Sequence, residues 1–575
     1  MNEIIPSRAE AIATLSAPGK EFELVEETIN GNPCRVFRNA PDTIRDLFDH
    51  AQQFADLDYL VYQSQGLTFA DTYQQAALIA RVLTEDLGVK KGDRVAIGMR
   101  NYPEWVTSFL AITSIGGIAV ALNALWNAEE LAYGLELTGS QILIADQERV
   151  ECLRDDLEQL DLRVLTVRCR DITSERINSL ENAIAEKSTG AIHSLPEVSL
   201  KGDDDALIIF TSGSTGHPKG AVSSHRAAVH AIMSWDFDAS IALWRANMQR
   251  PNEPWDIRFS LLVSVPLFHV SASHVGMLQA LWRGRCLHLM YRWDAIEALD
   301  IIEREQITHF IAVPAVTGDL VRAAVEHGRS LASLLMVGGG GAPRPAQQVR
   351  DIDKAFDSAV PGTGWGMTET NAIGAGISGP DYLQRPLSSG QCSAIYDMRI
   401  LGDDNHDVAK GEPGHLVIRG TGMFRKYWNN PQANAEAFVD GWFRTGDIAR
   451  IDEEGFLFIV DRAKDIVIRG GENIGCGEVE DAIYRHSGVS EAVVFGLPDE
   501  RLGEVVAAMV LPRQGQKLDE LRLRHHLQDH LATFQIPTRI FFCTSPLPRI
   551  ASGKFNKRQI RLDTIALLDL DTADT

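Results

Sequence analysis

The stretch ALIIFTSGSTGHPKG, residues 206–220, decides the fold class of this 575-residue chain. It begins with an apolar run of strand length and continues into a loop of glycine, serine and threonine. The residues that follow have a helical pattern that can begin at Ser223 or Ser224, since serine is a favoured N-cap residue. We therefore expect a strand, a loop and a helix in series, with backbone N–H groups of the loop open to a ligand.

The composition of this loop is typical of a polyphosphate site, although a glycine-rich surface turn is the alternative interpretation of the loop alone. Its hydroxyls and the Lys219 ammonium can surround phosphate oxygens. The Walker A pattern needs glycine before the lysine and serine or threonine after it, whereas Pro218 and Gly220 flank Lys219. The sequence thus predicts a nucleoside triphosphate site outside the P-loop class. The predicted phosphate-binding residues are Thr211, Ser212, Gly213, Ser214, Thr215, Gly216 and Lys219.

Short apolar runs alternate with helical patterns over the first two thirds of the chain. That alternation predicts an α/β fold in which helices cover parallel sheets. Turn-rich segments follow several of the runs, where open α/β sheets bind their ligands. The predicted strands are 94–97, 142–145, 207–210, 310–313 and 334–337, followed by 414–419 and 456–460 in a part with shorter strands.

The length of the chain is too great for one hydrophobic core, so more than one domain is expected. We expect a large N-terminal domain over residues 1–461, which includes a small β-rich subdomain over about 402–461. A mobile α+β domain is expected over residues 462–575.

The composition excludes several classes of protein. Lys and Arg total 55 against 78 Asp and Glu, and the net charge of −23 disfavours nucleic acid as a partner. The seven cysteines form no C-x-x-C pair, and the first residues lack the features of a signal peptide, so we expect a cytoplasmic protein. Two stretches without charged side chains, 108–126 and 260–282, contain glycine, proline and histidine, which favours buried core over a membrane span.

Six further segments, read together with the loop, resemble the adenylate-forming superfamily, which includes acyl-CoA synthetases, luciferases and peptide-synthetase adenylation domains. They occur in the order of that family and reach almost to the end of the chain. The segments are GGGAP (339–343), GWGMTE (364–369), WFRTGD (442–447), DRAKD (461–465), IRGGENI (468–474) and PRIASGK (548–554).

The resemblance implies a site for ATP and AMP. By that resemblance Trp365 lies beside the adenine, where the family has tyrosine, and Asp447 accepts hydrogen bonds from both ribose hydroxyls with Arg462 nearby. Thr368 is expected to contact phosphate, and Glu369 to bind Mg²⁺, which prefers carboxylate and phosphate oxygens. The same resemblance assigns to the nucleotide site Gly340, Gly341, Ala342, Pro343, Gly364, Gly366 and Met367.

The C-terminal segments imply a second conformation. Lys554 matches the family lysine that reaches both the carboxylate and the α-phosphate, and it is our principal candidate catalytic residue, together with Thr368, Glu369 and His269. A mobile cation at this place offsets the repulsion between two anions. By the same resemblance Lys464 is the expected hinge, where a few residues absorb the rotation of a domain. The candidate CoA-binding residues are Gly470, Gly471 and Glu472.

The substrate is expected to be a fatty or other hydrophobic acid. Amino-acid adenylation domains place an aspartate in a Phe-Asp-x-Ser element, and the matching element here is FHVS, 268–271, with His269 in that position. A second element, FDAS at 237–240, contains an aspartate, and we expect it at a helix end or in a loop. Apolar residues that follow His269 can line an acyl pocket or simply belong to the core: Val270, Ala272, Val275, Gly276, Met277, Leu278 and Ala280.

The predicted reaction has two half-steps, in which ATP and an acid give acyl-AMP and pyrophosphate, and CoA then displaces AMP. Another acyl acceptor, either an acyl carrier protein or oxygen as in luciferases, is one alternative. A non-catalytic nucleotide-binding sensor or scaffold is the second. Enzymes of this size are often symmetric dimers, so a homodimer is one expected assembly.

Overall fold

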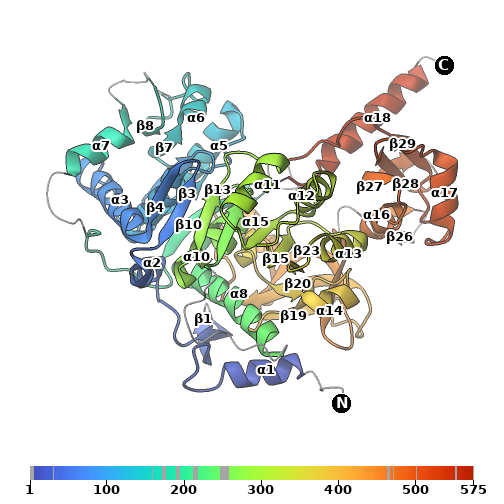
Figure 1. Ribbon diagram of the computed structural model, residues 1–575, viewed down its shortest axis with the longest axis horizontal. Helices are drawn as coiled ribbons and strands as arrows, with labels where there is room; N and C mark the ends of the chain where they lie inside the picture. Colours follow the sequence, from blue (N-terminus) through green and yellow to red (C-terminus); the bar gives the residue numbers. More distant parts are fainter. Residues whose placement is uncertain are drawn as a thin grey trace.

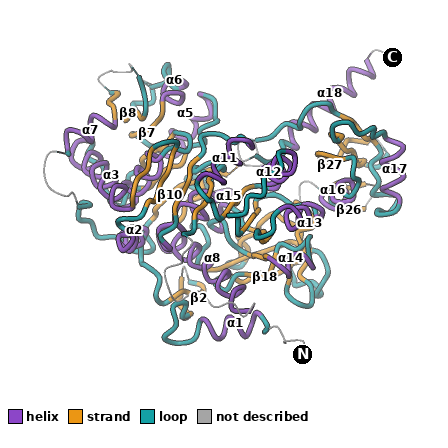
Figure 2. The backbone as a smooth tube through the Cα atoms, in the orientation of Figure 1, coloured by secondary structure: helices purple, strands orange, loops and turns teal. Residues whose placement is uncertain are grey.

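The computed structural model describes residues 6–29, 31–157, 159–170, 176–188, 194–211, 218–245, 258–462, 466–469, 472–499, 501–550 and 553–573. Figure 1 shows two large sheets in the body of the molecule and a smaller C-terminal lobe, coloured orange to red. Figure 2 shows strands in the interior and helices around them. An antiparallel hairpin of β1 (Leu24–Ile29) and β2 (Asn32–Phe37) lies near the N-terminus.

The first sheet has eight strands, and the six from β10 to β9 run parallel. Its two faces are buried against different clusters of apolar side chains, as expected for a sheet with helices on both sides. In sheet order its strands are β21 (Lys426–Tyr427), β11 (Lys219–Ser224), β10 (Asp205–Thr211), β6 (Ile118–Ala121), β5 (Arg94–Gly98), β7 (Ile142–Asp146), β8 (Arg163–Val167) and β9 (Ile177–Ser179).

The second sheet has 14 strands and also contains a parallel core, from β16 to β3. The short strands after residue 402 join this sheet where β24 pairs with β18. In sheet order its strands are β19 (Tyr396–Leu401), β20 (Gly414–Gly420), β23 (Trp442–Ile451), β24 (Phe456–Arg462), β18 (Gly390–Cys392), β17 (Ala375–Ser378), β16 (Val360–Trp365), β15 (Met336–Gly340), β14 (His309–Ala312), β12 (Ser260–Val263), β13 (Cys286–Leu289), β3 (Asp58–Tyr62) and β4 (Gln65–Thr68), with β22 (Phe438–Val439) beside β23.

The C-terminal lobe has a third sheet and hydrophobic clusters of its own, which fits a small α+β unit. Its strands are β26 (Glu472–Ile474), β25 (Val467–Arg469), β28 (Gly503–Pro512), β27 (Val489–Asp499) and β29 (Arg539–Phe542), and its helices are α16 (Cys476–Tyr484), α17 (Glu520–Gln528) and α18 (Lys557–Ala573). The predicted α/β class, with a large N-terminal part and a small C-terminal part, is confirmed. The exact boundary near residue 461 stays a prediction.

Helices cover the two large sheets. They are α1 (Arg8–Leu15), α2 (Ile44–His50), α3 (Phe69–Arg81), α4 (Pro103–Ser114), α5 (Ala128–Thr138), α6 (Gln147–Cys152), α7 (Leu180–Lys187), α8 (His225–Arg245), α9 (Val270–Ala272), α10 (Gln279–Arg283), α11 (Ala295–Arg304), α12 (Pro314–Glu326), α13 (Ala346–Ala355), α14 (Gly379–Gln384) and α15 (Pro431–Ala437). Short 3₁₀ or π-helical turns are η1 (Ala51–Phe54), η2 (Val82–Asp86), η3 (Ser273–Leu278) and η4 (Thr368–Thr370). No helix among the described residues is long and apolar enough to cross a membrane.

All seven predicted strands are present, but two local predictions are wrong. The predicted series of strand, loop and helix omits a strand, because β11 lies between the loop and α8 and pairs antiparallel with β10. The FDAS element lies within α8 and not at a helix end or in a loop. There Asp238 forms a 2.6 Å ion pair with Arg8 of α1, a contact between residues far apart in the sequence.

Ser224 caps α8, as one of the two predicted N-cap residues. Its Oγ accepts a hydrogen bond from the Ala227 N–H at 3.2 Å. We expect Ser224→Ala to lower the free energy of unfolding by about 1 kcal/mol, because one buried N–H at the helix start loses its partner. Urea unfolding measures this change, with the exposed Ser199→Ala as the control. Equal stability of the two variants would contradict a capping role.

Candidate active site

Two of the predicted nucleotide-binding segments meet at the carboxyl ends of two neighbouring parallel strands. Gly340 at the end of β15 pairs with Gly364 near the end of β16, and Trp365 follows directly. A side chain at Gly366 would collide with the Ala372 carbonyl, so only glycine fits there. This edge of the sheet is where open α/β folds place their ligands.

Asp447 lies on β23 opposite Arg462 of β24. Each of its two carboxylate oxygens has a partner. The Trp365 indole N–H donates to Oδ2 at 2.8 Å, and the Arg462 Nε lies 2.6 Å from Oδ1. Asp447 is only 2% exposed. The structure therefore brings the predicted adenine and ribose residues into one hydrogen-bonded group, in which an acceptor-only carboxylate faces donors.

Lys554 comes from the C-terminal lobe and lies against the loop after β15. Its Cε is 3.2 Å from the place that a Cβ of Gly341 would occupy, and Gly341 has a φ of 77°. Burial lowers the pKa of Lys554 to about 8, with a further decrease from the nearby Arg462 and an opposing increase from Asp447. The predicted catalytic lysine is thus next to the predicted nucleotide residues.

His269 is partly buried and directly precedes α9. Burial, together with the positive charge of Lys554, lowers the pKa of His269 to about 4. Its Nε2 has no hydrogen-bond partner among the described residues. At neutral pH the imidazole is therefore uncharged. It lies close enough to Lys554 for the ammonium charge to affect its pKa.

The lobe that carries Lys554 is held by other contacts. Arg549 forms ion pairs with Glu491 of its own lobe at 2.5 Å and with Asp319 of α12 at 3.7 Å. Asp481 of α16 accepts a hydrogen bond from the Ala346 N–H at 3.2 Å, at the start of α13. Sequence reasoning missed both contacts between the lobes, since nothing in the local sequence indicates them.

Glu369 lies in η4 and is buried. Burial raises its pKa, and a hydrogen bond from the Tyr427 hydroxyl, at 2.6 Å from Oε1, lowers it in part. No group of three His, Cys, Asp or Glu side chains suited to a metal was found among the described residues. Glu369 still fits Mg²⁺, which commonly uses one or two carboxylates and completes its ligands with phosphate oxygens.

Several predicted residues lie outside the described residues: Ser212, Gly213, Ser214, Thr215, Gly216, Lys464, Gly470 and Gly471. The two ends of the phosphate loop are described, and Thr211 on β10 pairs with Lys219 on β11. Glu472 is the first residue of β26 in the C-terminal lobe. Ala342 and Pro343 follow Gly341 in the turn that leads to α13, and Thr368 and Met367 lie at η4.

The apolar residues proposed for an acyl pocket are mostly buried in η3 and α10. A cavity of about 10 Å³ lies beside Val275 and Gly276, with Leu261 and His309 on its other walls. That volume is about enough for one water molecule. A substrate acid would therefore fit here only if side chains moved.

Comparison with known proteins agrees with this arrangement. Residues 47–428 match the family model described as "AMP-binding enzyme", and residues 478–554 match "AMP-binding enzyme C-terminal domain". The chain belongs to the AMP-binding enzyme family.

Relatives of this AMP-binding enzyme include acid–CoA ligases. It is 33% identical to the long-chain-fatty-acid–CoA ligase FadD13 of Mycobacterium tuberculosis, over 86% of this chain and 92% of that protein. It is 31% identical to a feruloyl-CoA synthase of Amycolatopsis sp, over 86% and 94% of the two chains. The crystal structure of ATP-bound MatB from Rhodopseudomonas palustris has a TM-score of 0.78 at 26% identity and covers 91% of this chain and 99% of that chain.

The predicted membership of the adenylate-forming superfamily, close to acyl-CoA synthetases, is thereby confirmed. The chain is an ATP-dependent enzyme of the acyl/aryl-CoA ligase group. The names of these relatives include both a fatty acid and an aromatic acid. The comparisons therefore do not decide whether the substrate of this chain is a fatty acid.

The lowered pKa of Lys554 gives this AMP-binding enzyme a predicted pH dependence. The ammonium charge is present below about pH 8 and is lost as the pH rises through that value. We expect kcat/KM for ATP, which reports on the free enzyme, to fall above about pH 8. Pyrophosphate release measures it. In Lys554→Arg the fall should move beyond the measured range, since arginine keeps its charge; an unchanged fall would contradict the assignment.

Proposed function

We propose that this chain is an acid–CoA ligase that activates a hydrophobic carboxylic acid in the cytoplasm, with fatty acids as the first candidates and aromatic acids as the second. The observation that carries the proposal is the position of Lys554, which lies against Gly341 and within electrostatic reach of Asp447 and Arg462. A protein that only bound a nucleotide would not need a lysine from a second lobe at this place.

The first half-step joins two anions, the substrate carboxylate and the α-phosphate, and the site offers a cation to them. A carboxylate oxygen of the acid attacks the α-phosphorus, the bond to the bridging oxygen breaks, and pyrophosphate leaves. Lys554 is proposed to contact both reacting groups and to stabilise the charge that develops between them. His269, being neutral, would not compete with Lys554 for the substrate carboxylate.

The nucleotide is proposed to be held by groups from both sheets. Asp447 would accept the ribose hydroxyls, and the ring of Trp365 would lie beside the adenine. Thr211 and Lys219 at the ends of the phosphate loop, with Thr368, would bind phosphate oxygens. Mg²⁺ bound at Glu369 with ATP would neutralise phosphate charge.

The second half-step requires a different arrangement of the C-terminal lobe. We propose that rotation about Lys464 removes Lys554 and brings the segment with Gly470, Gly471 and Glu472 to the acyl-AMP. The CoA sulfur then attacks the acyl carbon, the bond to the phosphate oxygen breaks, and AMP leaves. The thiol proton passes to solvent.

Pyrophosphate and AMP release test this function, with ATP, Mg²⁺ and a panel of fatty and aromatic acids, each with and without CoA. We expect sustained release of both products to depend on CoA, with pyrophosphate leaving before AMP in each turnover. Pyrophosphate release without any effect of CoA would point to another acyl acceptor. Nucleotide binding without product from any acid would contradict an enzymatic function.

A further inference from the structure

Tyr427 lies beside Lys219, which follows the phosphate loop, although the two residues are far apart in the sequence. It belongs to the two-residue strand β21, which pairs antiparallel with β11, with Tyr427 opposite Ala221. The strand β11 begins at Lys219, where the phosphate loop ends. The pairing therefore places the phenol ring next to the base of the loop.

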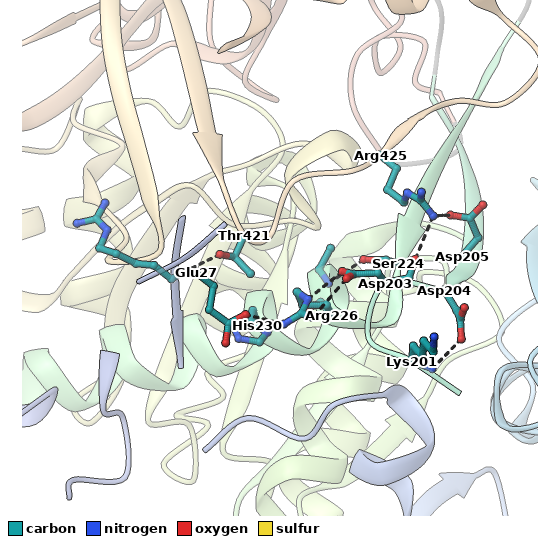
Figure 3. A network of polar contacts seen from close by, with 12 residues as sticks. Glu27, Lys201, Asp203, Asp204, Asp205, Ser224, Arg226, His230, Thr421 and Arg425 are labelled. Atoms are coloured by element: carbon teal, nitrogen blue, oxygen red, sulfur yellow. Dashed lines mark hydrogen bonds and ion pairs between the residues drawn. The ribbon is translucent and has the colours of Figure 1, made fainter. Parts of the chain in front are cut away.

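The backbone around Tyr427 is held firmly in this position. Arg425 donates from its backbone N–H to the Val222 carbonyl at 2.7 Å, and from its guanidinium to Asp205 at 2.8 Å. Figure 3 shows this reach of Arg425 to Asp205, next to the contacts of Arg226 with Asp203. Since Asp205 begins β10, the segment before Tyr427 is fastened to both strands that flank the loop.

The same segment is also fastened to η4, which carries the predicted metal ligand. The Phe424 N–H donates to the Glu369 carbonyl at 2.8 Å. The backbones of Glu369 and Tyr427 are thus fixed relative to each other through only three intervening residues. Their side chains meet across this short connection, where the Tyr427 hydroxyl donates to the Glu369 carboxylate.

The Tyr427 side chain makes two contacts with predicted site residues. Its hydroxyl is 2.6 Å from the Glu369 Oε1, and the Lys219 Nζ lies over its ring at 5.1 Å from the centre. A hydrogen bond to a buried carboxylate both stabilises its charge and fixes its rotamer. A cation over an aromatic face is attracted by the ring and held near it.

We propose that Tyr427 is a positioning residue for acyl-AMP formation, which holds the Glu369 carboxylate for the divalent cation and the Lys219 ammonium for the phosphates. The proposal rests on the function proposed above. The two parts of the side chain have different roles. The hydroxyl positions Glu369 for the cation, and the ring positions Lys219 for the phosphates.

Two variants separate these parts. Tyr427→Phe removes the hydroxyl and keeps the ring under Lys219, whereas Tyr427→Leu removes both contacts. Tyr59→Phe is the matched control, because the Tyr59 hydroxyl is also buried and donates to a backbone carbonyl, that of Met277, at 3.0 Å. Thermal unfolding of each variant shows the loss of stability that any buried hydroxyl would cause.

Mn²⁺ titration followed by electron paramagnetic resonance, with a non-hydrolysable ATP analogue, measures the cation site without turnover. We expect Tyr427→Phe to weaken Mn²⁺ binding roughly 10-fold, in line with the loss of a charged hydrogen bond. Binding of the analogue in EDTA should stay unchanged in Tyr427→Phe and weaken several-fold in Tyr427→Leu. Tyr59→Phe should lose stability without either effect.

The proposal would be overturned if Tyr427→Phe bound Mn²⁺ as tightly as the parent protein, or as tightly as Tyr59→Phe. Pyrophosphate release at varied Mg²⁺ is the second measurement, and there we expect the half-saturating Mg²⁺ concentration to rise roughly 10-fold. If the parent protein released no pyrophosphate with any acid, the proposed function would fail, while the Mn²⁺ titration would still decide the role of Tyr427.

Discussion

The contact between Lys554 and the backbone of Gly341 is the constraint on which the catalytic arrangement depends. The Lys554 Cε lies 3.2 Å and its Nζ 3.5 Å from the place of a Cβ at position 341, so a side chain there would crowd the lysine, and the φ of 77° also favours glycine. Arg549 and Asp481 add contacts between the same two lobes, through Asp319 and Ala346. The site is therefore complete only while the C-terminal lobe is docked on the body.

Much of the fold could be predicted, because the strands of a parallel sheet are continuous apolar runs that the sequence shows directly. The strand β11 could not be, since KGAVSS is short and its serines equally indicate a helix start. It is a strand because it pairs with β10 on one side and β21 on the other. Asp238 is a similar case, because it lies within α8 and its ion-pair partner, Arg8 of α1, is far away in the sequence.

The candidate site shows the same division between local and distant information. The segments GWGMTE, WFRTGD and DRAKD indicate Glu369, Asp447 and Arg462, but no segment indicates Tyr427. Tyr427 reaches Glu369 through the pairing of β21 with β11, and Arg462 reaches Asp447 through the register of β23 with β24. These partners are set by sheet pairing, which no single segment encodes. Burial, which changes the pKa of Lys554 and Glu369, is likewise a property of the assembled lobes.

Acid-dependent exchange of pyrophosphate into ATP by Gly341→Ala tests the account most directly. A methyl group at this position would stand 3.2 Å from the Lys554 Cε, whereas Gly328, with a φ of 61°, has no atom within 4 Å of its own Cβ position. Gly328→Ala thus controls for the backbone strain. We expect Gly341→Ala to lose most of the exchange and Gly328→Ala to keep it. Equal exchange by both variants would contradict the docking of Lys554 on Gly341 during acyl-AMP formation.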